Sequence, residues 1–220
     1  MASWSKTGCR SIGPGELRAS ATGRRPHRRQ EKALGSMRII AGELKGKRLA
    51  SPRGRAVRPT SERTREAVFN ILGDRVQGAV VLELFAGTGA FSIEALSRGA
   101  ASAVMIERSR EAIQLIGRNL AACRLAARAR VIRWDITRSL DCLRPLPGRF
   151  DLVFADPPYG QGAIGPCLRH LVVCGALADG ARVVIEHDSR EALPAESAPL
   201  RLTDRRKYGK ALVSFFTYVL

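Results

Sequence analysis

Short apolar runs alternate with segments of helical period along most of the chain. The runs are rich in Val, Ile, Leu and Phe, and they cover residues 80–85, 103–107, 130–134, 150–155 and 182–187. Runs of this length and composition are typical of strands that are buried on both faces. Helical segments follow the first, second and fourth runs, at residues 90–98, 109–123 and 164–176. This alternation predicts an α/β fold in which a mostly parallel sheet carries helices on both faces.

The C-terminal segment breaks this alternation. Residues 199–206 and 211–220 are both strand-like, and only the tetrapeptide Lys207-Tyr208-Gly209-Lys210 joins them. A connection this short, with a glycine in it, fits two antiparallel strands. We therefore expect a seven-stranded sheet that ends in an antiparallel hairpin.

The N-terminal part of the chain has a third pattern. Residues 38–49 predict a small hairpin around a glycine turn, and a helix over residues 62–72 follows it. Thr60 or Ser61 can cap this helix, and its apolar period predicts a buried face. The expected members of that face are Ala67, Val68, Ile71 and Leu72.

Residues 1–36 show no apolar period and are dominated by Gly, Ser, Pro and Arg, which predicts a disordered basic tail. Such a tail is either an RNA-binding arm or the product of an upstream start codon. The chain thus divides into a tail at 1–36, a hairpin-and-helix extension at 37–73 that contacts RNA, and a main domain at 74–220.

Positive charge is concentrated at the N-terminal end. The 220 residues carry a net charge of +17, to which residues 1–36 contribute +6 and residues 37–65 contribute +7. This distribution favours a polyanionic partner, with nucleic acid as the leading interpretation and a merely solvated basic tail as the alternative. No stretch approaches the roughly 18 uninterrupted apolar residues of a membrane span, so no membrane partner is expected.

Cysteine and histidine usage predicts neither a disulfide framework nor a metal site. The five cysteines are odd in number and include no Cys-x-x-Cys pair, and the three histidines show no ligand spacing. Because the hydrophobic region of a secretion signal is missing, we expect a cytoplasmic protein. Nothing in the sequence requires more than a monomer.

The segment Glu83-Leu84-Phe85-Ala86-Gly87-Thr88-Gly89 lies at the end of the first predicted strand and carries the first chemical signal. Glycines there let the backbone turn sharply and approach a ligand at the carboxyl edge of the sheet. Glu107 ends the second predicted strand, where a carboxylate can accept both hydroxyls of a ribose. Ser92 replaces the third glycine of a dinucleotide fingerprint, and an acid inside the strand suits a cationic cofactor. We therefore favour S-adenosylmethionine over a dinucleotide, with an ordinary strand-to-helix turn as the alternative.

Asp135 lies just after the third predicted strand. A carboxylate at that position can accept the amino group of an adenine. It can equally be the cap of a helix or an acid in a loop, and the residues alone do not decide between these interpretations.

The segment Asp156-Pro157-Pro158-Tyr159 directly follows the fourth predicted strand and carries the strongest signal. Two prolines fix an extended backbone and remove two competing N–H donors. The Asp156 carboxylate and the Pro157 carbonyl can then accept both protons of one exocyclic amine, which leaves its lone pair directed at a methyl group. Tyr159 offers a flat ring on which a base can stack.

Together these motifs resemble those of the Rossmann-like, S-adenosylmethionine-dependent amino methyltransferases. The segment Arg38-Ile39-Ile40-Ala41-Gly42 narrows the resemblance to the bacterial 16S ribosomal RNA guanine-N2 methyltransferases called RsmD. The segments Arg58-Pro59-Thr60, Arg63, Arg65-Glu66, Phe69-Asn70 and Lys207-Tyr208-Gly209 support the same resemblance. It covers residues 37–220 and offers no role for the tail.

The resemblance implies a substrate and a role for each site residue. The substrate is one guanine of 16S ribosomal RNA, presented by the small subunit or an assembly intermediate and flipped out of its stack. The residues implied to hold the cofactor are Glu83, Phe85, Ala86, Gly87, Gly89, Glu107, Arg108, Asp135 and Ile136. The catalytic residues that hold the base are Asp156, Pro157 and Tyr159. The expected RNA contacts are Arg38, Lys45, Lys47, Arg48, Arg58, Thr60, Arg63, Arg65, Lys207 and Tyr208.

Three other functions remain as alternatives. An adenine-N6 DNA methyltransferase shares the Asp-Pro-Pro-Tyr motif, but the chain has no separate target-recognition domain. A noncatalytic RNA-binding or assembly protein predicts damage to the motif or the glycine loop, and both are intact. A nicotinamide-dependent oxidoreductase is weaker, because of Ser92 and because no proton donor is evident.

Overall fold

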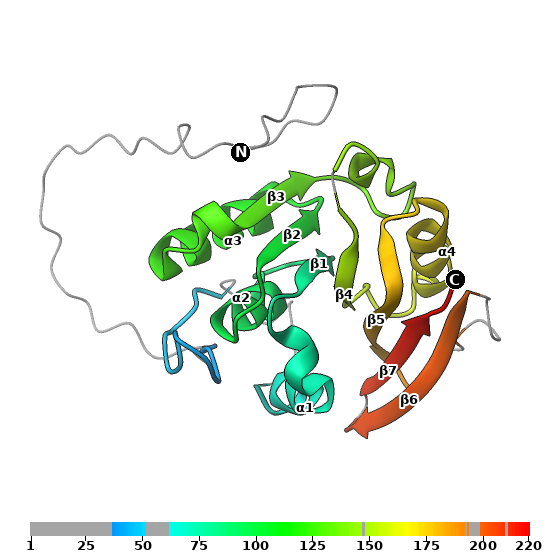
Figure 1. Ribbon diagram of the computed structural model, residues 1–220, viewed down its shortest axis with the longest axis horizontal. Helices are drawn as coiled ribbons and strands as arrows, with labels where there is room; N and C mark the ends of the chain where they lie inside the picture. The colour runs from blue at the N-terminus through cyan, green and yellow to red at the C-terminus, as the bar shows by residue number, and fades with distance from the viewer. Residues whose placement is uncertain (1–36, 52–61, 147, 192, 194–198, 210) are drawn as a thin grey trace, which may run out of the picture.

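The computed structural model describes residues 37–51, 62–146, 148–191, 193, 199–209 and 211–220. Its centre is one seven-stranded sheet in the order β3-β2-β1-β4-β5-β7-β6. The strands are β1 (Val80–Leu84), β2 (Ser102–Glu107), β3 (Ala129–Arg133), β4 (Phe150–Ala155), β5 (Leu177–Asp188), β6 (Leu200–Tyr208) and β7 (Ala211–Tyr218). The first five pair in parallel, whereas β7 pairs antiparallel with both β5 and β6. The predicted fold class and the terminal hairpin are confirmed, and Figure 1 shows that hairpin at one end of the sheet.

In the described parts of the chain, four α-helices accompany the sheet: α1 (Glu62–Leu72), α2 (Ala90–Ser97), α3 (Arg110–Cys123) and α4 (Ile164–Val173). Short 3₁₀ turns η1 (Gly73–Val76), η2 (Ala126–Arg128) and η3 (Asp141–Leu143) lie between elements. Ser109 caps α3 as expected, because its side chain accepts a hydrogen bond from the Ala112 N–H at 3.3 Å. The sequence therefore placed these helices to within a few residues.

Two hydrophobic clusters cover the two faces of the sheet. Successive side chains of a strand point to opposite faces, so neighbours in β1 and β4 join different clusters. Val81 and Phe154 pack with residues of α1, α2 and α3, whereas Leu82 and Val153 pack with residues of α4. Burial on both faces explains why the central strands are continuous apolar runs.

The segment of residues 37–51 packs against α2 but forms no regular strands. A single antiparallel bridge joins Arg38 and Arg48, where the sequence predicted a pair of small strands. The reason is that several backbone N–H groups of the segment bond α2 instead of a partner strand. Gly42 lies so close to α2 that a Cβ atom there would be 1.9 Å from the Ser97 carbonyl oxygen.

Helix α1 buries Val68 and Leu72 as predicted, but its buried face is turned away from Ile71. Its buried residues are Thr64, Arg65, Val68, Phe69 and Leu72, whereas Ile71 is 42% exposed. Phe69 packs against Phe91 and Phe154, which draws the face with residues 65, 69 and 72 toward the sheet. The predicted caps Thr60 and Ser61 and the basic tail at 1–36 lie outside the described residues. Among the described helices, none is long and apolar enough to cross a membrane.

Candidate active site

The sequence motifs meet where the strand order of the sheet reverses. Strands β1 and β4 are neighbours, and Leu84 is paired with Ala155 at their carboxyl ends. The glycine loop leaves β1 and the Asp-Pro-Pro-Tyr turn leaves β4 at this point, while Glu107 ends the adjacent strand β2. Open α/β sheets bind their ligands in the crevice at such a switch point.

The glycine loop has a backbone that ordinary residues rarely adopt. Gly87 and Gly89 have φ angles of 54° and 73°, and so does the bulky Phe85 at 56°. A left-handed conformation at a non-glycine residue costs roughly 1–3 kcal/mol and is found mainly at functional sites. Gly89 also packs tightly, since a Cβ atom there would lie 3.1 Å from the Met105 sulfur. This geometry fits a loop that brings its backbone close to a ligand.

Glu107 is fixed by the backbone around it. One carboxylate oxygen accepts the Gly87 N–H at 3.0 Å, and the other accepts the N–H groups of Arg108 and Ser109 at 2.8 and 2.9 Å. An ionised carboxylate offers about four acceptor positions. One position is left, and the oxygens lie at the carboxyl end of β2, where the ribose hydroxyls of a nucleoside are expected.

Glu83 is buried beneath the glycine loop. Its carboxylate accepts the N–H groups of Phe91 and Ser92 at 3.3 and 2.9 Å, at the start of α2. Burial disfavours the charged form and raises the pKa of Glu83 to about 7, although the bonds from Ser92 and Phe91 and the charge of Arg65 oppose this shift. A cationic ligand beside Glu83 would therefore stabilise its ionised form.

A cavity of about 150 Å³ lies between Glu83, the glycine loop and the end of β4. Its walls include Arg65, Glu83, Phe85, Phe154 and Asp156. The cavity thus reaches from the buried acid under the glycine loop to the first residue of the Asp-Pro-Pro-Tyr turn. The arrangement suits a cofactor whose charged end lies near Glu83 and whose reactive group faces Asp156.

Asp135 is a loop acid in this structure. Its carboxylate accepts the Thr137 hydroxyl at 2.7 Å and the Thr137 N–H at 3.1 Å, and Arg138 lies 3.7 Å away. The Thr137 hydroxyl is the main cause that holds the pKa of Asp135 below its ordinary value. The neighbouring Ile136 side chain is buried in the α4-side cluster. An adenine contact at this loop stays a prediction.

The Asp-Pro-Pro-Tyr turn is fastened by acids that the sequence analysis missed. The Tyr159 hydroxyl donates to Glu186 of β5 at 2.9 Å, and the Gly160 N–H donates to Glu191 at 2.7 Å. Pro157 is buried, whereas Tyr159 is exposed. No local sequence pattern predicts these contacts, because they depend on the pairing of β5 with β4.

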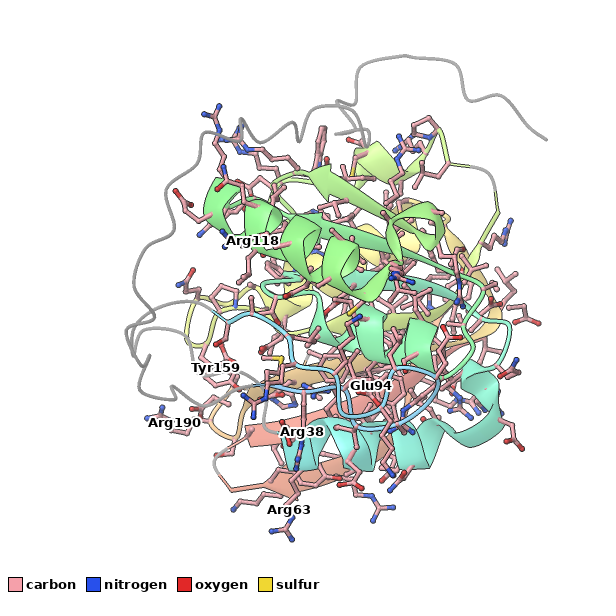
Figure 2. All side chains as sticks on the ribbon, turned by 90° about the vertical axis from the view of Figure 1, so that its left-hand side faces the viewer. Arg38, Arg63, Glu94, Arg118, Tyr159 and Arg190 are labelled. Carbon is pink, nitrogen blue, oxygen red and sulfur yellow. The ribbon has the colours of Figure 1, made fainter. Side chains whose placement is uncertain are left out.

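Most of the described basic residues predicted to contact RNA lie at the surface. Arg38, Lys45, Arg48, Arg63 and Lys207 are exposed, and Lys47 and Tyr208 are partly buried. Figure 2 shows Arg63 below Arg38, and both of them to the right of Arg190 in that view. Arg58 and Thr60 lie outside the described residues.

Arg65 requires a correction. It was predicted to contact RNA phosphates, but it is 0% exposed, and its side chain lies on the apolar face of α1. Its Nη2 donates to the Arg38 carbonyl oxygen at 2.6 Å, and its Nε lies 3.7 Å from a Glu94 carboxylate oxygen. A fully buried guanidinium cannot reach a phosphate on the surface.

Comparison with known proteins places the chain in a family. The model of the family described as "Conserved hypothetical protein 95" matches residues 37–217. The chain belongs to this family. Ribosomal RNA small subunit methyltransferase D of Escherichia coli (strain K12) is 37% identical over 164 residues, which are 74% of this chain and 81% of that protein.

Solved structures share the fold. A hypothetical protein of Thermus thermophilus is 30% identical, with a TM-score of 0.67 over 81% of this chain and 98% of its own. A methyltransferase-type chain complexed with SAH has a TM-score of 0.53 at 14% identity, over 67% of this chain and 48% of its own. The fold is shared with proteins that are named as methyltransferases, and S-adenosylmethionine stays the cofactor that the sequence predicts.

The site fits this cofactor. Glu107 offers its remaining acceptor position to a ribose hydroxyl, and charged side chains line the cavity beside Glu83, so that it can receive an amino-acid end. Among the described residues, no group of three or more His, Cys, Asp or Glu side chains could hold a metal ion. The fit to the cofactor therefore rests on Glu83, Glu107 and the cavity at this edge of the sheet.

Proposed function

We propose that this protein methylates the exocyclic N2 amine of one guanine in the 16S ribosomal RNA of the small subunit. The observation that carries the proposal is the position of the Asp156–Tyr159 turn, beside the glycine loop across the switch point of the sheet. The name of the Escherichia coli relative supports ribosomal RNA of the small subunit as the substrate class. The Arg-Ile-Ile-Ala-Gly segment, packed on α2 through Gly42, supports the narrower resemblance to the guanine-N2 enzymes.

The turn supplies the chemistry that an aromatic amine needs. The lone pair of such an amine is delocalised into the ring, which makes it a poor nucleophile. Asp156 and the Pro157 carbonyl would accept its two protons and so favour a pyramidal nitrogen with a localised lone pair. The cofactor supplies a methyl group on a positively charged sulfur, and after transfer the nitrogen gives up its extra proton to Asp156 or to water.

Tyr159 would hold the flipped base by stacking. Its ring is 44% exposed, and the bond from its hydroxyl to Glu186 limits how far the ring can swing. A stacked base contributes roughly 1–3 kcal/mol to binding. A base in a hairpin loop can leave its stack more easily than a base in a duplex, which favours a loop of the RNA as the target.

We further propose a cytoplasmic monomer that acts on the small subunit or an assembly intermediate. The exposed Arg38, Arg48 and Arg63 would contact phosphates of the RNA, which adds affinity without sequence choice. The target guanine would then be selected by its presentation to the Asp156–Tyr159 turn.

The test is transfer of a labelled methyl group, followed by identification of the labelled nucleoside. The acceptors are small subunits that lack native methylation, naked 16S RNA and duplex DNA. Labelled N2-methylguanosine from RNA supports the proposal. Labelled N6-methyladenine from DNA would replace it with DNA methylation, and no label despite intact cofactor binding would point to a noncatalytic protein.

A further inference from the structure

We propose that Arg65 is a cofactor-binding residue whose guanidinium binds the carboxylate of the methionine part of S-adenosylmethionine. Glu83 would lie beside the ammonium group of the same amino-acid end. The inference depends on the proposed function in one respect, namely that S-adenosylmethionine is the methyl donor. It assigns a cofactor contact to the N-terminal extension, which was expected to bind only RNA.

The first support is that the guanidinium is buried with unused donors. Arg65 is 0% exposed and lines the cavity that also contains Glu83 and Asp156. Its Nη2 is bonded to the Arg38 carbonyl oxygen, but Nε and Nη1 have no hydrogen-bond partner in the described parts of the chain. Buried donors are nearly always satisfied in native proteins, so two unused donors on one charged group indicate a missing partner.

The nearby acid Glu94 does not fill this need. Its carboxylate already accepts the N–H groups of Ile40 and Ala41 at 2.8 and 2.9 Å and the Arg98 Nε at 2.8 Å. Arg65 Nε stays 3.7 Å from this carboxylate, which is beyond hydrogen-bond distance. Figure 2 labels Glu94 beside the pale-blue segment of residues 37–51, to whose backbone it is bonded. Glu94 therefore lowers the cost of burying Arg65 without occupying its free donors.

The cavity presents one buried cation and one buried acid together. Burial lowers the pKa of Arg65, and the acids Glu94, Glu62 and Glu83 oppose this shift. A phosphate would suit Arg65, but the carboxylate of Glu83 on the same cavity would repel it. An α-amino acid end carries a carboxylate and an ammonium group, which match Arg65 and Glu83 in turn. Guanidinium and carboxylate groups pair through parallel hydrogen bonds.

The same contact connects the extension to the catalytic edge. Arg65 holds the carbonyl group of Arg38, and the Arg38 side chain is exposed and bonded to Glu62 at 3.0 Å. Asn119 of α3 fastens the other end of the segment, since its amide bonds the Ala50 backbone and the Thr88 carbonyl of the glycine loop. The extension thus forms one wall of the cofactor cavity.

The experiment measures how much of the binding free energy depends on the carboxylate. The full chain is titrated by calorimetry with S-adenosylhomocysteine and with its decarboxylated form, 5′-(3-aminopropylthio)-5′-deoxyadenosine, which keeps the ammonium group. The wild type should bind the first ligand about 10- to 100-fold more tightly, since hydrogen bonds to charged groups are worth this factor. Arg65→Met should lose that factor for S-adenosylhomocysteine and bind the decarboxylated ligand within about threefold of the wild type.

Arg98→Met is the matched control. Arg98 also pairs with Glu94, at 2.8 Å, but it does not line the cavity. This variant should keep the preference for the carboxylate. If Arg65→Met fails to fold, two other measurements still test the inference. The wild type should bind the ligand with the carboxylate more tightly than the decarboxylated ligand, and Arg65→Lys should retain the charge but only part of this preference.

Three results would overturn the inference. The wild type could bind the two ligands equally, Arg65→Met could weaken both by the same factor as a structural residue would, or it could leave both unchanged. A methyl group found on a nucleoside other than guanosine would refute the proposed substrate and leave this ligand preference in place.

Discussion

On the cofactor side of the switch point the acids are bonded to backbone N–H groups, whereas on the base side the turn after β4 is held by side chains. Glu83 accepts from the first turn of α2 and Glu107 accepts from the loops beside it, so neither carboxylate can move unless those segments move. Tyr159 and Gly160 bond instead to Glu186 and Glu191, which are side chains of another segment. The cofactor half is thus preformed, while the base half can adjust. This difference fits a small ligand of one shape on one side and a flipped base of a large RNA on the other.

The largest effect is expected from Asp156→Ala. The variant should lower the rate of methyl transfer by about a hundredfold or more, because a group that manages the protons of the reacting amine contributes about 10²–10⁴. Binding of S-adenosylhomocysteine should change little, because the preformed half of the site is untouched. The measurements are single-turnover transfer and calorimetry. Asp151→Ala, at the opposite end of β4, is the control and should keep its transfer rate.

A large loss of cofactor affinity in Asp156→Ala would contradict this division. It would place Asp156 among the residues that hold the cofactor, and the two halves of the site could no longer be separated.

The second prediction concerns the free-energy cost of burying the Glu83 carboxylate in the preformed half of the site. The folded pKa of Glu83 is raised from 4.5 to about 7, so the protonated form is favoured in the folded protein. The stability that this group contributes is present below about pH 4.5 and is lost as the pH rises through about 7. At 1.36 kcal/mol per pKa unit the loss is on the order of 3 kcal/mol.

Urea unfolding of the wild type and Glu83→Gln without cofactor, at pH 5 and pH 8, checks this. The free energy of unfolding of the wild type, relative to that of Glu83→Gln, should be smaller at pH 8 than at pH 5. An unchanged difference would show that the carboxylate is no harder to ionise in the fold than in the unfolded chain, and that its burial carries no cost.

The third prediction tests the adjustable half. Tyr159→Ala should weaken binding of the RNA substrate by about 5- to 150-fold, which corresponds to roughly 1–3 kcal/mol of stacking. Tyr159→Phe keeps the ring and loses only the bond to Glu186, so its effect should be smaller. Cofactor affinity should stay unchanged in both. The Michaelis constant for the small subunit and the affinity for S-adenosylhomocysteine are the measurements, and equal losses in the two variants would make the hydroxyl, not the ring, the important group.

The sequence predicted the strands of the sheet, the alternation of strands and helices along the chain, and the position of Glu107 at the end of a strand. Each of these features depends on a local pattern. Continuous apolar runs identify central strands, and an acid at the end of a strand lies at the ligand edge whatever surrounds it. Arg65 was misplaced although it shares the helical stripe of Val68, Phe69 and Leu72, because a charged residue on a stripe is usually solvated. Glu94, the buried acid that makes its burial tolerable, is distant in sequence.

The contacts of the base side were also beyond the sequence. Glu186 faces Tyr159 only because β5 pairs with β4, and Glu191 reaches Gly160 from the segment after β5. Gly42 could be read as a turn residue, but its close approach to Ser97 depends on how the extension packs on α2. Long-range pairings of this kind are set by the tertiary structure and leave no local pattern.

The smallest effect is expected at the RNA surface, which lies outside both halves of the site. Replacing Arg38 and Arg63 together by Ala should flatten the salt dependence of RNA binding, because each lost phosphate contact lowers the slope of log K against log salt by about 0.7 on single strands. Both side chains are exposed, so the fold should be unaffected. Arg144→Ala is the control, since that exposed arginine pairs with Asp141 beside the α4-side cluster. Binding measured across a salt series gives the slope. A slope equal to that of the wild type would show that Arg38 and Arg63 are ordinary solvated residues that do not contact the RNA. The positive charge of the N-terminal part would then act through residues other than these two.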